Sequence, residues 1–184
     1  AANFAISGVL TLAANGAITQ TGVLNLSTSA ASLLIRQANT ASTVLLTQNN
    51  FLSNVAANVN GAISINSALT VASLTDDIGT VNGIITSNDN VTLTANSTIS
   101  ESVGAIISGA TLTTTSVGGT ALGNANTVTG FNATNSSVGG ITLTNTASTL
   151  TITGISQSAG DVVTVNNTGA IDITGSVVGT APTI

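Results

Sequence analysis

A short phrase recurs along the whole chain, in which two apolar residues flank a Thr, Ser, Asn or Asp. The residues of each phrase alternate with period two, which is typical of a strand that buries one face. Many short strands at a regular spacing indicate a repeat fold. The copies are Leu10-Thr11-Leu12, Leu24-Asn25-Leu26, Ile63-Ser64-Ile65, Leu69-Thr70-Val71, Val91-Thr92-Leu93, Ile141-Thr142-Leu143, Leu150-Thr151-Ile152, Val163-Thr164-Val165 and Ile171-Asp172-Ile173.

Two longer phrases give the period of the repeat. Gly61-Ala62-Ile63 returns as Gly83-Ile84-Ile85 and again as Gly104-Ala105-Ile106, and Ser116-Val117-Gly118-Gly119 returns as Ser137-Val138-Gly139-Gly140. Both phrases give a period of about 21 residues, enough for the three short strands and three turns of one coil in a right-handed parallel β-helix. We therefore predict an all-β fold, a single β-solenoid domain over residues 1–184 with about eight to nine coils. The first phrase predicts that Ile63, Ile85 (or Ile84) and Ile106 stack in one interior column.

The composition agrees with an ordered solenoid that lacks a conventional aromatic core. Hydrophobic residues make up 42% of the 184 positions and charged residues only 4%, whereas disorder couples low hydrophobicity to high charge. Low-complexity coil is the alternative, and the periodic apolar positions disfavour it.

The least regular stretches are 31–50, where strands or a short helix are expected, and 118–130, where a turn-rich excursion around Leu122 is expected.

The charges exclude several classes of partner. Six carboxylates stand against Arg36 as the only basic residue, and binding to nucleic acid or to an anionic membrane surface needs several Lys or Arg. No apolar run is long enough for a membrane-spanning helix. Cysteine is absent, so disulfides and thiolate metal sites are excluded.

The carboxylates are the only candidates for metal or acid–base chemistry. Asp76 and Asp77 lie about one coil before Glu101, with Asp89 between them, and a stacked cluster of this kind is a possible Ca²⁺ site. The Gly-rich Ca²⁺-binding nonapeptide is missing, so solvated turn residues are the favoured interpretation. The remaining carboxylates are Asp161 and Asp172.

An enzyme and an ice-binding protein are both disfavoured. The chain has no His for general acid–base catalysis, and Arg36 alone is a poor anion clamp, so it is expected on the surface or in a terminal coil. The run Thr111–Thr115 is a possible hydroxyl array, but a regular Thr-x-Thr on one face of every coil is missing. We predict no catalytic residues, no cofactor and no metal site.

The segment from Gly8 to Leu74 resembles the shaft of the filamentous haemagglutinin-type adhesins, which are exported by two-partner secretion. The resemblance rests on Ala17-Ile18-Thr19-Gln20-Thr21-Gly22, on Leu46-Thr47-Gln48-Asn49-Asn50-Phe51 with Val55 after it, and on Ala68-Leu69-Thr70-Val71-Ala72-Ser73-Leu74. It implies long β-helical arrays without catalytic residues. The chain opens Ala1-Ala2-Asn3-Phe4, without Met, which suggests a mature chain or an excised piece.

Two functional hypotheses follow from these observations. The first is a non-catalytic shaft segment of a secreted or surface-anchored bacterial adhesin, located outside the cell or on its surface, with a host or cell-surface receptor or glycan as a possible partner. The second is a self-assembling subunit of an extracellular filament or sheath. In both, unprotected strand edges at the ends of a solenoid favour end-to-end self-association, and neither nucleic acid nor membrane insertion is expected.

Overall fold

The computed structural model describes residues 8–26, 31–38, 42–158, 161–179 and 182–183, and no residue in these ranges is helical. The chain forms strands joined by turns, because small polar residues and glycine disfavour helix while β-branched residues alternate with them. The strands are β1 (Val9–Ala14), β2 (Ile18–Thr19), β3 (Ser32–Gln37), β4 (Val44–Val59), β5 (Ile63–Val71), β6 (Ser73–Asp76), β7 (Gly79–Thr86), β8 (Val91–Thr94), β9 (Ile99–Glu101), β10 (Ile106–Ser116), β11 (Thr120–Asn135), β12 (Ile141–Asn145), β13 (Thr149–Gln157), β14 (Val163–Asn167), β15 (Ala170–Ile173), β16 (Val177–Val178) and β17 (Pro182–Thr183).

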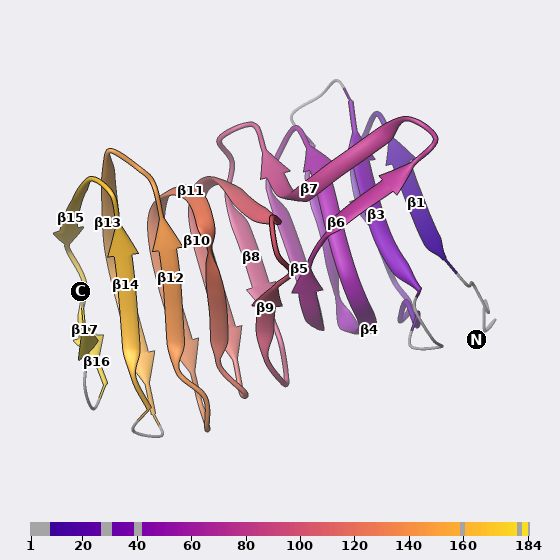
Figure 1. The fold of residues 1–184 in the computed structure, drawn as a ribbon. Helices are drawn as coiled ribbons and strands as arrows, with labels where there is room; N and C mark the ends of the chain where they lie inside the picture. The colour runs from indigo at the N-terminus through magenta and orange to yellow at the C-terminus, as the bar shows by residue number, and fades with distance from the viewer. Residues whose placement is uncertain (1–7, 27–30, 39–41, 159–160, 180–181, 184) are drawn as a thin grey trace.

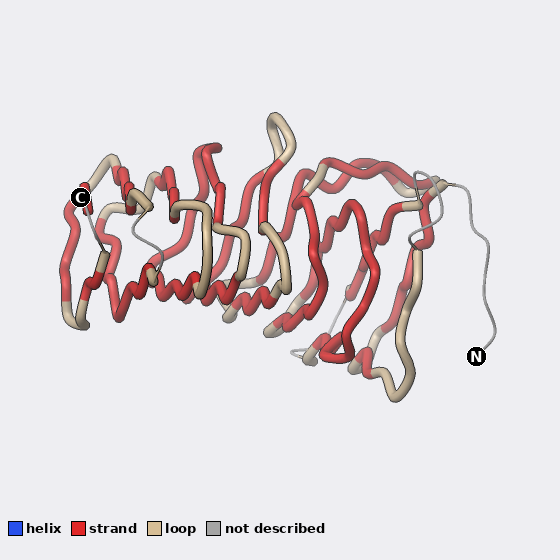
Figure 2. Tube along the Cα trace, turned by 90° about the horizontal axis from the view of Figure 1, so that it is seen from below, coloured by secondary structure: helices blue, strands red, loops and turns tan. Residues whose placement is uncertain are grey.

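These strands stack in parallel as a β-solenoid of about 7 turns with roughly 22 residues per turn. β1 lies near one end of the rod and β15 to β17 at the other (Figure 1), and the view from below shows the successive coils side by side (Figure 2). The predicted fold class is confirmed. The turns are fewer than the predicted eight to nine. The coil length also varies, since the step from Ile63 to its partner Val91 is longer than the step from Leu112 to its partner Phe131.

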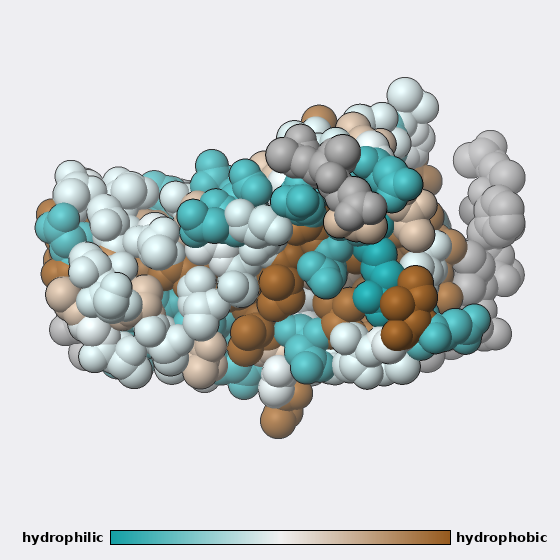
Figure 3. Space-filling model, turned by 90° about the horizontal axis from the view of Figure 1, so that it is seen from above, coloured by the Kyte–Doolittle hydropathy of each residue, from teal (hydrophilic) through white to brown (hydrophobic). Residues whose placement is uncertain are grey.

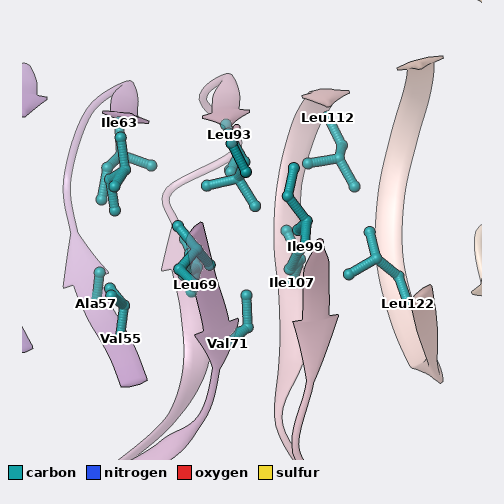
Figure 4. Packing of buried hydrophobic residues seen from close by; sticks show 14 of the residues in the cluster. Val55, Ala57, Ile63, Leu69, Val71, Leu93, Ile99, Ile107, Leu112 and Leu122 are labelled. Carbon is teal, nitrogen blue, oxygen red and sulfur yellow. The ribbon is translucent and has the colours of Figure 1, made fainter. Parts of the chain in front are cut away.

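The core is a set of apolar columns that run along the rod. Paired residues in successive coils put one side chain above the next, and the described members of one such column are almost all fully buried. Figure 4 shows part of this packing, including Ile63, Leu93 and Leu112. Each coil alone buries little, so the stacking creates the core. This column contains Val44, Ile63, Val91, Leu112, Phe131 and Ile152.

Buried asparagine side chains stack on one another at a corner of the coil, as the apolar side chains do along the strands. Asn126 pairs with Asn145, and their exposed fractions are 0% and 1%. The Asn145 Oδ1 accepts the Val128 N–H at 2.9 Å, and its Nδ2 donates to the Val128 carbonyl at 3.0 Å. A buried amide is tolerated here because it bonds the backbone groups that the corner leaves unpaired.

The predicted column of Ile63, Ile85 and Ile106 is wrong. Ile63 pairs with Val91, whereas Ile84 pairs with Ala57 on one side and Ile107 on the other, in a different column. Ile84 and Ile107 are fully buried, and Ile106 is half-buried. The second and third phrases lie at the same part of successive coils but two residues out of register, because Gly83 pairs with Ile106. The first phrase opens β5, which pairs with β8 at this point, so the three phrases do not stack in one column.

The second repeated phrase is confirmed by the way its glycines stack. Thr120 pairs with Ile141, which places the two Ser-Val-Gly-Gly turns in successive coils. Gly119 and Gly139 have φ values of +99° and +90°, a region that side chains rarely adopt. A Cβ on Gly139 would also lie 2.3 Å from the Gly118 carbonyl oxygen. Only glycine allows the two turns to approach this closely.

Both irregular stretches contain strands. Residues 32–37 and 44–59 form β3 and β4, as the strand alternative predicted, and residues 39–41, where the possible short helix would sit, lie outside the described residues. The expected excursion around Leu122 is wrong, because β11 covers Thr120–Asn135 and Leu122 is fully buried in the core. Its alternating pattern was obscured by the many Asn, Thr and Gly residues around it.

One element leaves the solenoid. β6 pairs with the start of β7 in antiparallel orientation, with Asp76 opposite Gly79. This hairpin lies across the outer surface of the first coils, above β3 and β1 (Figure 1). Leu74 and Val81 of the hairpin pack against Leu34 and Ala56, which point away from the main core and form a second small hydrophobic cluster with them. The hairpin also explains why the coil between Ile63 and Val91 is long.

Candidate functional surfaces

The tip of the β6–β7 hairpin is attached to the solenoid by an ion pair. The Arg36 Nε and one Nη donate to the two Asp76 carboxylate oxygens, each at 2.8 Å, and the same Nη donates to the Gly79 carbonyl at 2.7 Å. Thr11 of β1 donates its hydroxyl to Asp76 at 3.3 Å. The Arg36 and Asp76 side chains are 16% and 13% exposed. The contact joins β1, β3 and the hairpin, and we call it the hairpin latch.

Arg36, the only basic residue of the chain, has its guanidinium group occupied by the hairpin latch. Hydrogen bonds from Arg36, with further ones from the Ile78 and Gly79 N–H groups, hold the pKa of Asp76 well below its usual range. A bidentate Arg–carboxylate pair has fixed geometry, so Arg36 is engaged rather than presented to an anionic ligand. Arg36 was expected on the surface or in a terminal coil, and it lies in β3 beside β1, where a carboxylate from a distant part of the sequence pairs with it.

The carboxylates singled out in the sequence do not form a metal site. Asp76 belongs to the latch and Glu101 lies in β9, on a different part of the coil. Asp161 accepts the Gly139 N–H at 2.7 Å and so closes a turn. Among the residues that the structure describes, no group of three or more His, Cys, Asp or Glu is placed to hold a metal ion.

Glu101 occupies a position that the solenoid otherwise gives to an apolar side chain. It pairs with Val71 on one side, and the pairing of Ser100 with Ala121 brings Leu122 next to it on the other. Val71 and Leu122 are both fully buried. The Glu101 Oε2 accepts the Asn124 N–H at 3.0 Å, whereas Oε1 is buried and has no hydrogen-bond partner.

This environment changes the acidity of the carboxyl. Burial raises the pKa of Glu101 to about 7, and the Asn124 backbone N–H and the nearby Asn126 amide oppose the rise only in part. The sequence contained the signal for this placement: in Ile99-Ser100-Glu101, alternation puts Glu101 on the same side as the buried Ile99. The expectation that Glu101 is a solvated turn residue is therefore corrected.

Hydroxyl and amide groups form two columns on an outer surface of the rod. Ser64, Thr92, Thr113 and Asn132 pair in succession, and two residues further along each strand Asn66, Thr94, Thr115 and Thr134 do the same. Within these two columns Thr-x-Thr is present in β8 and β10, while the neighbouring strands β5 and β11 have Ser or Asn in at least one of the two positions. Figure 3 shows that hydrophilic and neutral residues dominate the face seen from above, with hydrophobic residues in separate patches.

The structure also exposes an aromatic side chain that sequence reasoning did not place on the surface. Phe51 of β4 is 54% exposed, whereas Phe131 is fully buried. In Asn50-Phe51-Leu52 the polar Asn50 and the apolar Leu52 point inward while the aromatic Phe51 points outward, so residue type does not give the inner face here. The outward position of Phe51 and the inward position of Asn50 follow only from the register of β4 with its neighbouring strands.

The described part of the chain contains no helix able to cross a membrane. Comparisons with models of protein families, with curated proteins and with solved structures find no match for this chain.

Proposed function

We propose that this chain is a non-catalytic shaft segment of a secreted or surface-anchored bacterial adhesin. The observation that carries the proposal is the unbroken interior column from Val44 to Ile152, which keeps its pairing through every coil that it crosses. A core of this kind has no natural limit in length, since each coil contacts only its neighbours. Such an architecture suits a rigid extension better than an enclosed site.

The surface chemistry supports the same role. Charged residues make up 4% of the chain, and the outer surface carries Thr, Asn and Ser instead. The resemblance of residues 8–74 to the filamentous haemagglutinin-type shafts points in the same direction. The described carboxylates do not gather in a group of three or more, and Glu101, whose pKa burial raises, faces the core.

Immunolabelling of intact source cells tests the proposal. Antibodies raised against the chain are expected to label intact, non-permeabilised cells and to detect the protein in the surface or medium fraction. A cytoplasmic protein serves as the control for cell integrity. Labelling that appears only after lysis would contradict a secreted or surface-anchored shaft.

The alternative is a self-assembling subunit of an extracellular filament or sheath. Among the described residues, the first strand β1 pairs only with β3, and β15 to β17 pair only with strands of the preceding coil. The end strands of this segment therefore present backbone groups with which another copy can pair. The mass of the polypeptide recovered from the cell surface discriminates between the two functions. A mass far above 17.8 kDa supports the shaft, and a mass near it supports the subunit.

A further inference from the structure

Two adjoining hollows form a groove on the outer surface of β4 and β5. The first has a volume of about 190 Å³, the second about 350 Å³, and Leu52, Ser53 and Ala68 line both. The described residues that line the two hollows include no charged side chain. We call this continuous depression the β4–β5 groove.

Phe51 forms an aromatic wall of the first hollow. Its N–H donates to the Leu24 carbonyl at 3.0 Å, and its carbonyl accepts the Leu26 N–H at 2.8 Å, so the backbone is fixed between coils. On the other side Phe51 pairs with Ala68. The alanine methyl is small, so the space beside the exposed ring stays open. Such a ring offers a flat apolar surface at low entropic cost.

Asparagine amides line the first hollow together with this ring. The Asn66 Nδ2 donates to the Asn49 Oδ1 at 3.0 Å, which leaves the side-chain N–H groups of Asn49 and the side-chain oxygen of Asn66 for other partners. Asn96, in the turn after β8, is exposed and lines the same hollow. Amides both donate and accept, which matches hydroxyl groups, since these do the same.

The second hollow continues the groove with hydroxyl groups. Thr70, Thr98 and Ser100 line it, and the Thr70 and Ser100 hydroxyls lie 3.0 Å apart. The first hollow is smaller than the roughly 300–1,000 Å³ of drug-sized pockets. A linear ligand with one unit beside Phe51 and the next units over the hydroxyls fits this shape better than one bulky molecule does.

We propose that the β4–β5 groove binds a neutral oligosaccharide, with the apolar face of one sugar ring against Phe51 and its hydroxyl groups on Asn49, Asn66 and Asn96. The inference deepens the proposed adhesin function and rests on it. The absence of charged residues from the lining disfavours sulfated or acidic sugars, because their charge would lie against surfaces with no cation. Arg36, the only basic residue, is held in the hairpin latch.

Nuclear magnetic resonance of the intact chain with ¹³C-labelled phenylalanine rings tests the proposal. The chain contains three Phe and no Tyr, Trp or His, so the aromatic spectrum is simple, and Phe51→Ala assigns the Phe51 signals. Cellohexaose, chitohexaose and maltohexaose serve as neutral probes, and a heparin-derived hexasaccharide serves as the sulfated probe. Phe131, which is fully buried, is an internal control.

At least one neutral probe is expected to shift the Phe51 ring signals in a saturable manner while the Phe131 signals stay unchanged. Asn49→Ala combined with Asn66→Ala is expected to weaken binding about tenfold, which corresponds to the loss of a good hydrogen-bonding pair. Val138→Ala, at an exposed position in the turn after β11 and outside the groove, is the matched control and is expected to bind normally. Circular dichroism confirms that each variant folds.

Two results would overturn the inference. One is that no neutral probe shifts the Phe51 signals, and the other is that only the sulfated probe does. Neither result changes the immunolabelling of intact cells. Surface labelling without glycan binding would therefore overturn only the glycan-binding groove, whereas loss of surface labelling would overturn the proposed adhesin function.

Discussion

Glu101 is a charged residue in a position that is costly for the fold. Its side chain takes the place of a core residue between Val71 and Leu122, yet it carries a carboxyl with one unpartnered oxygen. A buried polar group without a partner lowers stability, and an ionised one lowers it more. The cost is therefore largest where the carboxyl is charged.

This gives a pH dependence with a definite sign. The pKa of Glu101 in the folded chain is about 7, against 4.5 for the ordinary group, so the folded state binds the proton more tightly than the unfolded state. The contribution of the Glu101 carboxyl to stability is then fully present below about pH 4.5 and is lost as pH rises from there through about 7, which lowers the free energy of unfolding by about 1–3 kcal/mol after allowance for partial exposure. Denaturant unfolding across this range measures it.

The matched variants are Glu101→Gln and Asp77→Asn. Glu101→Gln is expected to remove this fall in stability and to be the more stable protein at pH 8, since the amide keeps the shape without the charge. Asp77 is exposed in the hairpin turn, so its substitution is expected to leave the pH profile close to that of the parent chain. An unchanged profile in Glu101→Gln would show that another group causes the dependence.

Ile107 and its neighbour Ile106 test the register of β10. Ile107 is fully buried and pairs with Ile84, whereas Ile106 is half-buried and pairs with Gly83. Ile107→Ala is expected to lower the free energy of unfolding by about 2–5 kcal/mol through lost burial and a cavity, and Ile106→Ala by clearly less. Thermal and denaturant unfolding compare them. Equal losses would contradict the assigned inward and outward faces.

The β6–β7 hairpin is the element that departs from the repeat. It buries Leu34 and Ala56, which would otherwise be apolar residues on the outside of β3 and β4. The hairpin latch fixes its tip to β3 through Arg36 and to β1 through Thr11. The element therefore acts as a strap over the first coils, and its stability depends on a small hydrophobic contact and one ion pair.

Breaking the latch is expected to loosen the hairpin while the solenoid stays folded. In Asp76→Asn the bidentate pair is lost, and amide hydrogen exchange over residues 74–81 is expected to become several-fold faster, because local opening is cheapest where few apolar contacts hold an element. Arg36→Gln is expected to give the same effect, and the double variant no more than either single variant. Exchange at β12 and β14 serves as the internal control. Unchanged exchange in the hairpin would show that the apolar contacts alone hold it.

The described part of the chain is a rod with strand edges at β1 and at β15 to β17, and the chain carries little charge. Repulsion between copies is therefore weak, and addition of one copy to the end of another is a heterologous contact that extends without closing. We expect the isolated segment to form end-to-end oligomers. Because backbone pairing and apolar contact would drive this association, its strength is expected to change less than about twofold with added salt.

Sedimentation velocity and negative-stain images measure this association. Val9→Lys places a charge on the end strand β1 at an exposed position and is expected to weaken association. Ala121→Lys places the same charge on an exposed position of β11, a strand paired on both sides, and is expected to associate normally. Stable monomers of the parent chain at high concentration would count against the prediction.

The sequence by itself determined the architecture. Alternation with period two, turn residues between short apolar phrases and the regular return of longer phrases leave few folds other than a parallel solenoid. The stacked turns at Gly119 and Gly139 follow from the same evidence, because a repeated glycine pair indicates a repeated close approach. The strands and the glycine turns each depend on a few consecutive residues, so a short sequence pattern is enough to predict them.

Only the tertiary structure decided how the coils are aligned and which polar residues lie inside. The hairpin lengthens the coil between Ile63 and Val91, so a fixed step along the chain does not lead from Ile63 to its partner. The same fixed step from Ile85 assigned Ile106 to the core, whereas the register pairs Ile84 with the buried Ile107. The partnership of Arg36 with Asp76, 40 residues apart, and the outward ring of Phe51 depend on which strand is stacked on which. Alternation gives each strand two faces. Packing against the neighbouring coils decides which face lies inside. This packing energy depends on residues far apart in the sequence, so no single stretch of the sequence contains it.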